Sequence, residues 1–368
     1  AKIAFERLPP VRVKGLAEPV DVARPMGALA TGTERRAVVG REAERAVLGA
    51  AVEAAAAPGG GDGLWAIVGE PAIGKSLLLN DTLARAAARG VPACTGLANA
   101  IERATAYYAW RDIVAEALGE QAEVSPERLR AALAARLADA PALVPRAPVL
   151  GAILPFGLPD TTETRDMDAA ARADSVEDLV TYILATPGTP LVVLDDAHWL
   201  DSASIALARA VLRRVPGLVM IVASRPIEER ANPELAALFA SARAVVRLEP
   251  LVSADVHALL SRRLGGVALD DDLVSLVMQR TDGRPYFAEE LAVAMRDAGA
   301  IVVEDGRARL VAGAAHAFRA AASLEAVLRE RLDRLPPREQ LVVKTASAIG
   351  HIFPDQMLVD IHPIDEDR

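Results

Sequence analysis

Short apolar runs alternate with stretches of helical period through the middle of this chain. The run Leu64-Trp65-Ala66-Ile67-Val68 contains no polar residue, and similar runs occupy 191–194 and 218–223. Continuous apolar runs of this length are typical of parallel strands buried on both faces, and the stretches between them have the composition of helices. The pattern therefore predicts an α/β fold in which helices cover both faces of a parallel sheet. The expected strands are 64–68, 91–97, 191–194, 218–223 and 244–248, and the expected helices include 41–57, 76–88 and 202–214.

The flanking regions follow other patterns. Residues 1–25 contain two short β-type segments, around Val11–Lys14 and Val20–Ala23, with a turn at Gly15. Two such strands are too few to be stable alone, so we expect them to be the end of a domain that lies upstream. Residues 26–37 are small and polar and are expected to form a linker. Residues 100–186 are mostly helical by pattern with a proline-rich interruption, and the pattern after Pro250 is helical throughout.

The composition sets the size of the core and narrows the classes of partner. The chain has 368 residues, of which 52% are hydrophobic and only 4% aromatic, so a large core must be built mainly from Ala, Leu and Val. That length suggests two or three structural units. The net charge of −9 disfavours nucleic acid as a direct partner, because domains that grip it usually present a basic face.

Neither a secretory signal nor a membrane span is visible in the sequence. The first residues lack an apolar signal-peptide core, and no run reaches the roughly 18–20 apolar residues of a span. The single cysteine, Cys94, excludes an internal disulfide framework and fits a reducing compartment. We therefore expect a soluble, cytoplasmic protein that does not bind membranes and whose two ends both look cut.

The strongest chemical signal is an eight-residue motif between a predicted strand and a predicted helix. It fits the pattern G-x-x-x-x-G-K-[ST] in full, and chance matches in this context are rare. Its glycines let the backbone wrap a phosphate with successive N–H groups pointing inward, and the following helix adds the positive end of its dipole. Lys75 would reach the β- and γ-phosphates, and the Ser76 hydroxyl would ligate Mg²⁺. The motif consists of Gly69, Glu70, Pro71, Ala72, Ile73, Gly74, Lys75 and Ser76.

A pair of acids follows the apolar run at 191–194. Asp195 is placed to hold Mg²⁺, through water, and Asp196 to polarise the water that attacks the γ-phosphate. Acids at strand ends often only cap the next turn, and this alternative has even weight when the pair is taken alone. The presence of the phosphate-binding motif favours the catalytic interpretation.

Other polar residues carry weaker signals. The predicted strand 218–223 ends in Ser224-Arg225-Pro226, where a polar side chain could sense the γ-phosphate, although Arg225 is also interpretable as a plain surface arginine. The five histidines show no metal-ligand spacing. His198 is expected to order the loop after the acid pair rather than to do chemistry, and Cys94 to be a small core residue.

With these residues in place, the chain resembles the ATPase module of the STAND class of AAA-related NTPases, over roughly residues 38–355. This version occurs after bacterial class III adenylate/guanylate cyclase domains and in large LuxR-type regulators. Val39-Gly40-Arg41-Glu42 resembles the family's first motif, near the bound base and ribose, and the segment 195–201 resembles its extended Walker B signature. The segment 281–285 resembles the GxP motif of the helical lid, and 329–336 resembles the start of a winged-helix-like segment.

The resemblance implies an organisation and a set of ligands. It implies a P-loop ATPase core at 38–250, a helical lid at 251–320 and a truncated winged-helix-like segment at 321–368. ATP and Mg²⁺ are the implied ligands, with Arg41 and Pro285 at the base and ribose. Ala72 stands where the family often has Gly, and Arg284 where it usually has Asn, which leaves binding expected and the hydrolysis rate less certain.

The N-terminal stretch from Phe5 to Val22 is similar to the closing hairpin of class III nucleotide cyclases, with an unrelated hairpin as the alternative. The resemblance implies a cyclase–ATPase fusion, with a cyclase domain upstream and a repeat or sensor domain downstream. Because the cyclase's metal-binding aspartates would lie upstream, no cyclase activity is expected from this chain.

The expected function is a nucleotide switch that binds Mg·ATP, hydrolyses it slowly and controls an attached cyclase, with nucleotide-dependent oligomerisation possible. Two alternatives remain at this point. One is the sensor of a LuxR-type transcription regulator, and the other is a dedicated P-loop kinase or motor-like ATPase, for which the sequence shows no acceptor motif.

Overall fold

The computed structural model describes residues 3–7, 23–28, 38–57, 59, 61–121, 124–185, 191–227, 230, 232–304, 306–311, 332 and 335–349. It divides into two compact units, Ala1–Val38 and Val39–Arg368. In the first unit, β1 (Ile3–Arg7) pairs antiparallel with β2 (Ala23–Ala28). The predicted strand Val11–Lys14 lies outside the described residues. β2 continues into 26–28, the start of the expected linker, because pairing with β1 satisfies its backbone groups.

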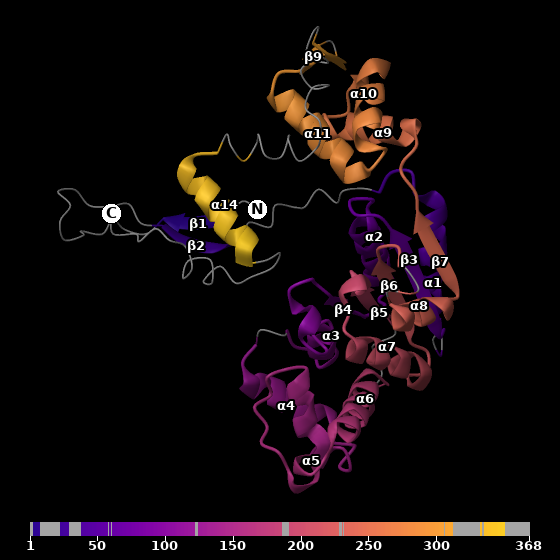
Figure 1. The fold of residues 1–368 in the computed structure, drawn as a ribbon, viewed down its shortest axis with the longest axis vertical. Coiled ribbons are helices and arrows are strands. Elements are labelled where there is room, and N and C mark those ends of the chain that lie inside the picture. Colours follow the sequence, from indigo (N-terminus) through magenta and orange to yellow (C-terminus); the bar gives the residue numbers. More distant parts are fainter. Residues whose placement is uncertain are drawn as a thin grey trace, which may run out of the picture. The chain divides into compact units, whose positions relative to one another are not determined.

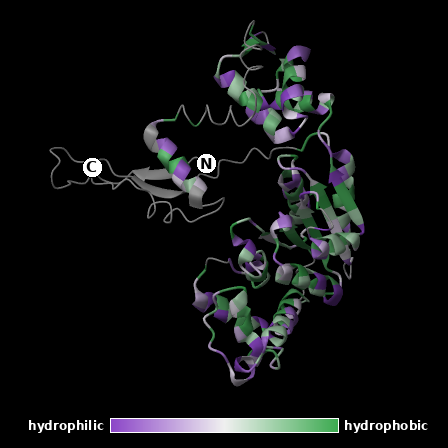
Figure 2. Ribbon diagram, viewed as in Figure 1, coloured by the Kyte–Doolittle hydropathy of each residue, from purple (hydrophilic) through white to green (hydrophobic). Residues whose placement is uncertain are grey.

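The second unit is built on the predicted parallel sheet. All five strands are parallel, in the order β4-β5-β6-β3-β7, which confirms the α/β fold (Figure 1). Figure 2 colours these strands towards the hydrophobic end of its scale, and β3, β5 and β6 in the middle of the sheet are buried along nearly their whole length, as burial on both faces requires. The strands are β3 (Gly63–Gly69), β4 (Ala93–Leu97), β5 (Leu191–Asp195), β6 (Val219–Ser224) and β7 (Ala244–Leu248).

Helices join and cover these strands. The helices α1 and α2 pack against one another and both contact the sheet, whereas α7 packs against α6 and α8. The start of α7 is fixed by its N-cap, Asp201, whose carboxylate accepts the Ser204 N–H at 2.9 Å. Their bounds are α1 (Glu42–Ala56), α2 (Lys75–Ala88), α7 (Ser202–Arg214) and α8 (Pro233–Ala240), with the 3₁₀ turn η3 (Ala197–Trp199) before α7.

The segment between β4 and β5 forms helices that share the core of the sheet. Trp110 is fully buried and its indole N–H donates to the Ser204 carbonyl at 3.2 Å. The fully buried Phe156 belongs to the same hydrophobic cluster as Leu194 of β5. This segment is therefore packed onto the sheet and not attached to it loosely. Its elements are η1 (Glu102–Ala104), α3 (Trp110–Ala117), α4 (Pro126–Arg136), η2 (Val144–Ala152), α5 (Thr162–Arg165) and α6 (Ala169–Ala185).

The segment after Pro250 has a hydrophobic cluster of its own. The expectation that it is helical throughout was wrong, since three short strands form a mixed sheet in the order β8-β10-β9. The β-branched run Ile301-Val302-Val303 and the Asp305-Gly306 pair, a strong hairpin signal, account for β9 and β10. The elements are α9 (Ser253–Arg263), β8 (Ala268–Leu269), α10 (Asp271–Thr281), α11 (Pro285–Asp297), β9 (Ile301–Glu304) and β10 (Arg307–Leu310), followed later by α14 (Pro337–Ile349).

Candidate functional site

The register of the sheet brings three strand ends to one edge. Val68 of β3 lies opposite Ser224 of β6, and Leu194 of β5 lies opposite Val222 of β6. The last residues of β3, β5 and β6 are Gly69, Asp195 and Ser224, so all three stand at the carboxyl end of the sheet. Ligands of open parallel sheets bind at this end.

The loop that leaves β3 has the backbone of an anion cradle. Gly74 adopts a left-handed conformation, with φ +101°, immediately before the 14-residue helix α2. A side chain at Gly74 would meet no atom within 4 Å, so the space beside it is open. Ala72 is also left-handed, with φ +64°, a conformation that a non-glycine residue adopts at a cost. The open turn and the helix N-terminus together fit a phosphate.

Lys75 is held inside this cradle. It is only 7% exposed, and its ammonium donates to the carbonyls of Gly69 at 2.9 Å and Glu70 at 3.0 Å. Burial lowers the pKa of Lys75 below the ordinary lysine value, while the carboxylates of Asp196 and Asp195 oppose this effect. A bound phosphate would offer this ammonium much stronger acceptors than two carbonyls.

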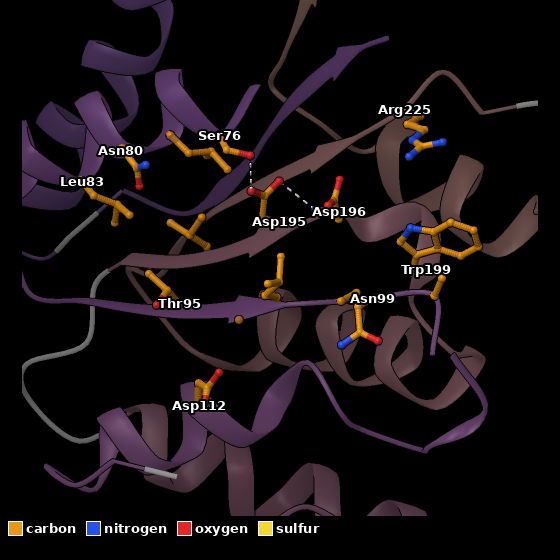
Figure 3. Close-up of a pocket in the computed structure, with 16 residues that line it drawn as sticks. Ser76, Asn80, Leu83, Thr95, Asn99, Asp112, Asp195, Asp196, Trp199 and Arg225 are labelled. Carbon is orange, nitrogen blue, oxygen red and sulfur yellow. Dashed lines mark hydrogen bonds between the residues drawn. The ribbon is translucent and has the colours of Figure 1, made fainter. Parts of the chain in front are cut away.

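Ser76 and Asp195 meet at the first turn of α2. The Ser76 hydroxyl donates to Asp195 Oδ2 at 2.8 Å, and the Asp196 N–H donates to Asp195 Oδ1 at 2.8 Å (Figure 3). Burial raises the pKa of Asp195, although the Ser76 hydrogen bond opposes the shift. An adjacent hydroxyl and carboxylate fit Mg²⁺, which takes few protein ligands and keeps water and phosphate oxygens as the others. Within the described residues, no cluster of three or more His, Cys, Asp or Glu side chains offers an all-protein metal site.

Asp196 and Arg225 lie next to this pair. Asp196 is left-handed, with φ +52° and ψ +39°, and its side chain is 40% exposed. The Arg225 guanidinium carbon lies 6.0 Å from the centre of the Trp199 ring, and Figure 3 shows the arginine near Trp199. Both residues line a hollow of about 590 Å³ that also reaches Ser76 and Asp195. The residues predicted for hydrolysis are thus brought together with those predicted for binding.

Two further polar residues at this edge were given no chemical role by the sequence. Ser224 is fully buried, and within the described part of the chain its hydroxyl has no hydrogen-bond partner. His198 in η3 has two buried ring nitrogens that also lack such a partner there. Buried polar groups are nearly always satisfied, so both are candidates for contact with a ligand. The signal available in the sequence was the polar Ser224 at the end of an apolar strand, which was passed over in favour of its charged neighbour.

Arg41 and Pro285 are the two residues that the resemblance assigns to the base and ribose, and their contacts in the structure differ. The buried Arg41 guanidinium donates to Glu44 at 3.0 Å and to the Glu249 carbonyl at 2.6 Å, so it ties α1 to the chain after β7. Pro285 begins α11, and the N–H of the next residue, Tyr286, donates to the Ala72 carbonyl at 3.4 Å. The start of α11 therefore contacts the phosphate-binding loop directly.

Across the ranges that the structure describes, no helix combines the length and the apolar character needed to cross a bilayer.

Comparison with protein families gives two matches. A family described as AAA ATPase domain matches residues 37–223, slightly more than half of the chain. A domain family of unknown function matches residues 253–309, which run from the start of α9 into β10. A comparison with curated proteins found no match.

The chain is similar to several solved structures at low sequence identity. The Orc1 protein of Aeropyrum pernix, solved in complex with DNA, is 19% identical with a TM-score of 0.50, over 85% of this chain and 73% of that one. Cdc6p of Pyrobaculum aerophilum is 14% identical with a TM-score of 0.42, over 88% and 79% of the two chains. The Thermotoga maritima RuvB Holliday junction branch migration motor is 15% identical with a TM-score of 0.40, over 89% and 84%.

Proposed function

The chain belongs to the AAA ATPase domain family, and from this premise we propose that it is a regulatory switch that binds Mg·ATP and hydrolyses it slowly. The observation that carries the proposal is the meeting of Lys75, Ser76 and Asp195 at the carboxyl end of the sheet. A buried ammonium, a helix N-terminus and a hydroxyl–carboxylate pair are the groups that a nucleoside triphosphate with Mg²⁺ requires.

The residues of the site divide the work of hydrolysis. Lys75 and the N–H groups of the loop hold the β- and γ-phosphates. Ser76 and Asp195 would hold Mg²⁺, which when bound would neutralise phosphate charge. Asp196 accepts a proton from water as the water oxygen bonds to the γ-phosphorus and the bond from that phosphorus to ADP breaks. Phosphate and ADP are the products. Arg225, which lines the hollow together with Asp195 and Asp196, would contact the γ-phosphate or the attacking water.

The switch works between the core and the segment that begins with α9. The Tyr286 N–H is bonded to the Ala72 carbonyl in the phosphate-binding loop, so a change in the loop on ATP binding reaches α11 directly. ATP stabilises the arrangement with Pro285 against the nucleotide, and hydrolysis or exchange releases it. Without a partner, turnover is on the order of 10⁻⁴ to 10⁻² s⁻¹, as in unassisted P-loop switches.

The proposal extends to the parent polypeptide. The resemblance of residues 5–22 to the closing hairpin of class III cyclases supports an upstream cyclase domain under control of this switch. Sequencing upstream of Ala1 in the parent gene tests this extension, and the absence of a cyclase domain with its metal-binding aspartates would remove it.

The central test is ATP and ADP affinity with and without Mg²⁺, measured by calorimetry on the wild type and on Lys75→Ala. We expect micromolar, Mg²⁺-dependent binding that falls at least about 100-fold in Lys75→Ala, because a buried charge pair is worth several kcal/mol. Lys344→Ala, which removes an exposed lysine of α14, is the matched control and should bind as the wild type does. Absence of binding by the folded wild type would refute the proposal, and turnover above about 10 s⁻¹ without a partner would refute the switch.

A further inference from the structure

The hollow beside Asp195 is larger than the hydrolysis of ATP requires. Its volume is about 590 Å³, whereas one water molecule takes up about 30 Å³ in the liquid. Of the phosphate-binding motif only Ser76 lines it, so the phosphates held by the loop would lie outside. Pockets of about 300–1,000 Å³ commonly hold a small organic ligand. The hollow therefore has room for a second ligand beside the γ-phosphate and the attacking water.

Three elements build the end of the hollow that lies away from Arg225, which we call the far end. Its labelled residues are Leu83 of α2, Thr95 of β4 and Asp112 of α3, and Figure 3 shows them apart from Arg225. Leu83 follows Ser76 by seven positions, which is about two helical turns, so both residues stand on one face of α2. That face of the helix leads from the phosphate site to the far end.

Apolar side chains make up much of the wall. Leu79 of α2, Leu97 of β4 and Val193 of β5 all line the hollow, in addition to Leu83. A saturated carbon chain placed against them would leave water, which is favourable. The wall therefore suits a ligand whose middle part is aliphatic.

The charges on the lining favour a cation. Asp112 stands at the far end and Asp195 and Asp196 at the phosphate site, whereas Arg225 is the one cationic side chain among the described lining residues. A bound ATP would add the negative charge of its γ-phosphate. Within the described ranges these acids do not form a cluster that could hold a metal ion. An organic cation is therefore the better fit.

Glu116, one helical turn after Asp112 on α3, adds to the negative charge of the far end. Its carboxylate accepts the Thr95 N–H at 2.7 Å and the Thr95 hydroxyl at 3.3 Å. Burial raises the pKa of Glu116, the bonds from Thr95 oppose the shift, and the Asp112 carboxylate adds to it. Asp112 lines the hollow and Glu116 does not, so Asp112 is the carboxylate that a ligand would meet.

We propose that this hollow binds a short aliphatic diamine while Mg·ATP is bound. One ammonium pairs with Asp112, the other pairs with the γ-phosphate and Asp196, and the carbon chain between them packs on Leu79 and Leu83. The inference rests on the proposed binding of Mg·ATP, because the γ-phosphate supplies the second negative pole. A diamine held in this way distinguishes ATP from ADP. It therefore stabilises the ATP-bound state of the switch, and ATP tightens diamine binding by the same factor.

The test compares three probes of similar length and different charge. They are 1,4-diaminobutane, 1-aminobutane with one ammonium, and 1,4-butanediol with none. Each is titrated by calorimetry into the wild type with Mg²⁺ and either a non-hydrolysable ATP analogue or ADP. The nucleotide is kept equimolar to the protein, because diamines also pair with free triphosphates.

Three variants locate the binding. Asp112→Asn removes the charge at the far end and keeps the shape of an exposed side chain, and Leu83→Trp fills the hollow. Asp139→Asn, which neutralises an exposed acid that does not line the hollow, is the matched control. Affinity for the ATP analogue and the melting temperature are measured on every variant.

We expect 1,4-diaminobutane to bind the complex with the ATP analogue with a Kd of about 0.1–1 mM, as suits a ligand of this size. This complex should bind it at least about fivefold more tightly than the ADP complex does, and at least about fivefold more tightly than it binds 1-aminobutane, since each comparison removes one ion pair. Asp112→Asn and Leu83→Trp should lose this preference and still bind the ATP analogue as the wild type does. Asp139→Asn should match the wild type throughout.

The outcomes distinguish this inference from the proposed function. Equal affinity for the diamine and either of the other probes would overturn the inference, and so would unchanged diamine affinity in Asp112→Asn. Equal affinity of the ATP-analogue and ADP complexes for the diamine would also overturn it, because the γ-phosphate would then play no part. Each of these results leaves the ATPase proposal intact. A folded wild type that does not bind the ATP analogue would refute the proposed function, and this inference with it.

Discussion

The two halves of the site differ in how far they are assembled before any ligand binds. On the binding side, Lys75 donates to two carbonyls and Ser76 donates to Asp195, so the charged and hydroxyl groups already have partners. On the hydrolysis side, Ser224 and His198 have no hydrogen-bond partner among the residues described. Under the proposed function, the protein would preorganise the capture of the nucleotide and complete the hydrolytic geometry only around the bound substrate. Such an arrangement would suit the slow, switchable ATPase that we propose.

The largest expected effects come from substituting, one at a time, the two neighbouring acids that define these halves. Asp196→Asn should lower turnover by about 100-fold or more, as loss of a general base does, while ATP affinity changes less than about threefold. Asp195→Asn should instead weaken Mg²⁺-dependent ATP binding, because Asp195 accepts the Ser76 hydroxyl at the metal position. Calorimetry and steady-state turnover on both variants check the contrast. If Asp196→Asn loses affinity as much as turnover, the division into two halves fails.

The Ser224 hydroxyl offers a smaller effect on the hydrolysis side. Ser224→Ala should lower turnover about tenfold, since one hydrogen bond to a charged group is worth about 1.5–3 kcal/mol. Its melting temperature should be unchanged or higher, because the variant removes a buried hydroxyl that lacks a partner in the described structure. Thermal denaturation measures the melting temperature of this variant, and a steady-state assay measures its turnover. The exposed Ser76 stays unchanged in both experiments. A clear loss of stability would mean that the hydroxyl has a structural partner.

The protonation of His198 should make stability depend on pH. Its pKa is about 4 in the folded protein and near 6.5 in an unfolded chain, so protons bind the unfolded state more readily. The stability contributed by its neutral form is complete above about pH 6.5 and is lost as the pH falls towards 4. The melting temperature of the wild type should fall over this window more steeply than that of His198→Leu. Identical pH profiles for the two proteins would show that His198 titrates normally.

The smallest effect concerns backbone strain on the binding side. Ala72→Gly should raise the free energy of unfolding by no more than about 1 kcal/mol, because glycine adopts φ +64° without the penalty that alanine bears. ATP affinity should stay within about threefold, since the hydrogen bond from Tyr286 uses the Ala72 carbonyl and survives the change. Chemical denaturation measures the stability. A destabilised variant would indicate that the methyl group packs against a neighbour.

The residues that the sequence assigned to the binding half lie together in the structure because the pattern that places them is local. The motif from Gly69 to Ser76 predicts a phosphate-binding loop from its residue types alone. Asp195 follows a buried strand, and in a parallel sheet the end of that strand lies beside Ser76. The strands predicted at 191–194 and 218–223 match β5 and β6 within a residue at each end. Continuous apolar runs with sharp ends explain this success.

On the hydrolysis side the sequence pointed to Asp196 and Arg225, but Ser224 and His198 could not be predicted in the same way. Whether Ser224 and His198 are satisfied depends on which side chains approach from other strands, and no spacing along the chain encodes that. The small mixed sheet was missed because helical period dominated the segment after Pro250, while β8 contributes only two residues. The packing of Trp110 onto α7, across 94 positions of sequence, is likewise a tertiary property.

The two hydrophobic clusters of the second unit also bear on how the protein melts. The helices between β4 and β5 share one cluster with the sheet, so they should lose structure together with the ATPase core in a single cooperative step. The segment from Leu251 to Ala308 has its own cluster and can open as a separate foldon. Calorimetric domains in this chain would therefore follow cores and not sequence motifs, and ATP, if it contacts both as we propose, would draw two melting events into one.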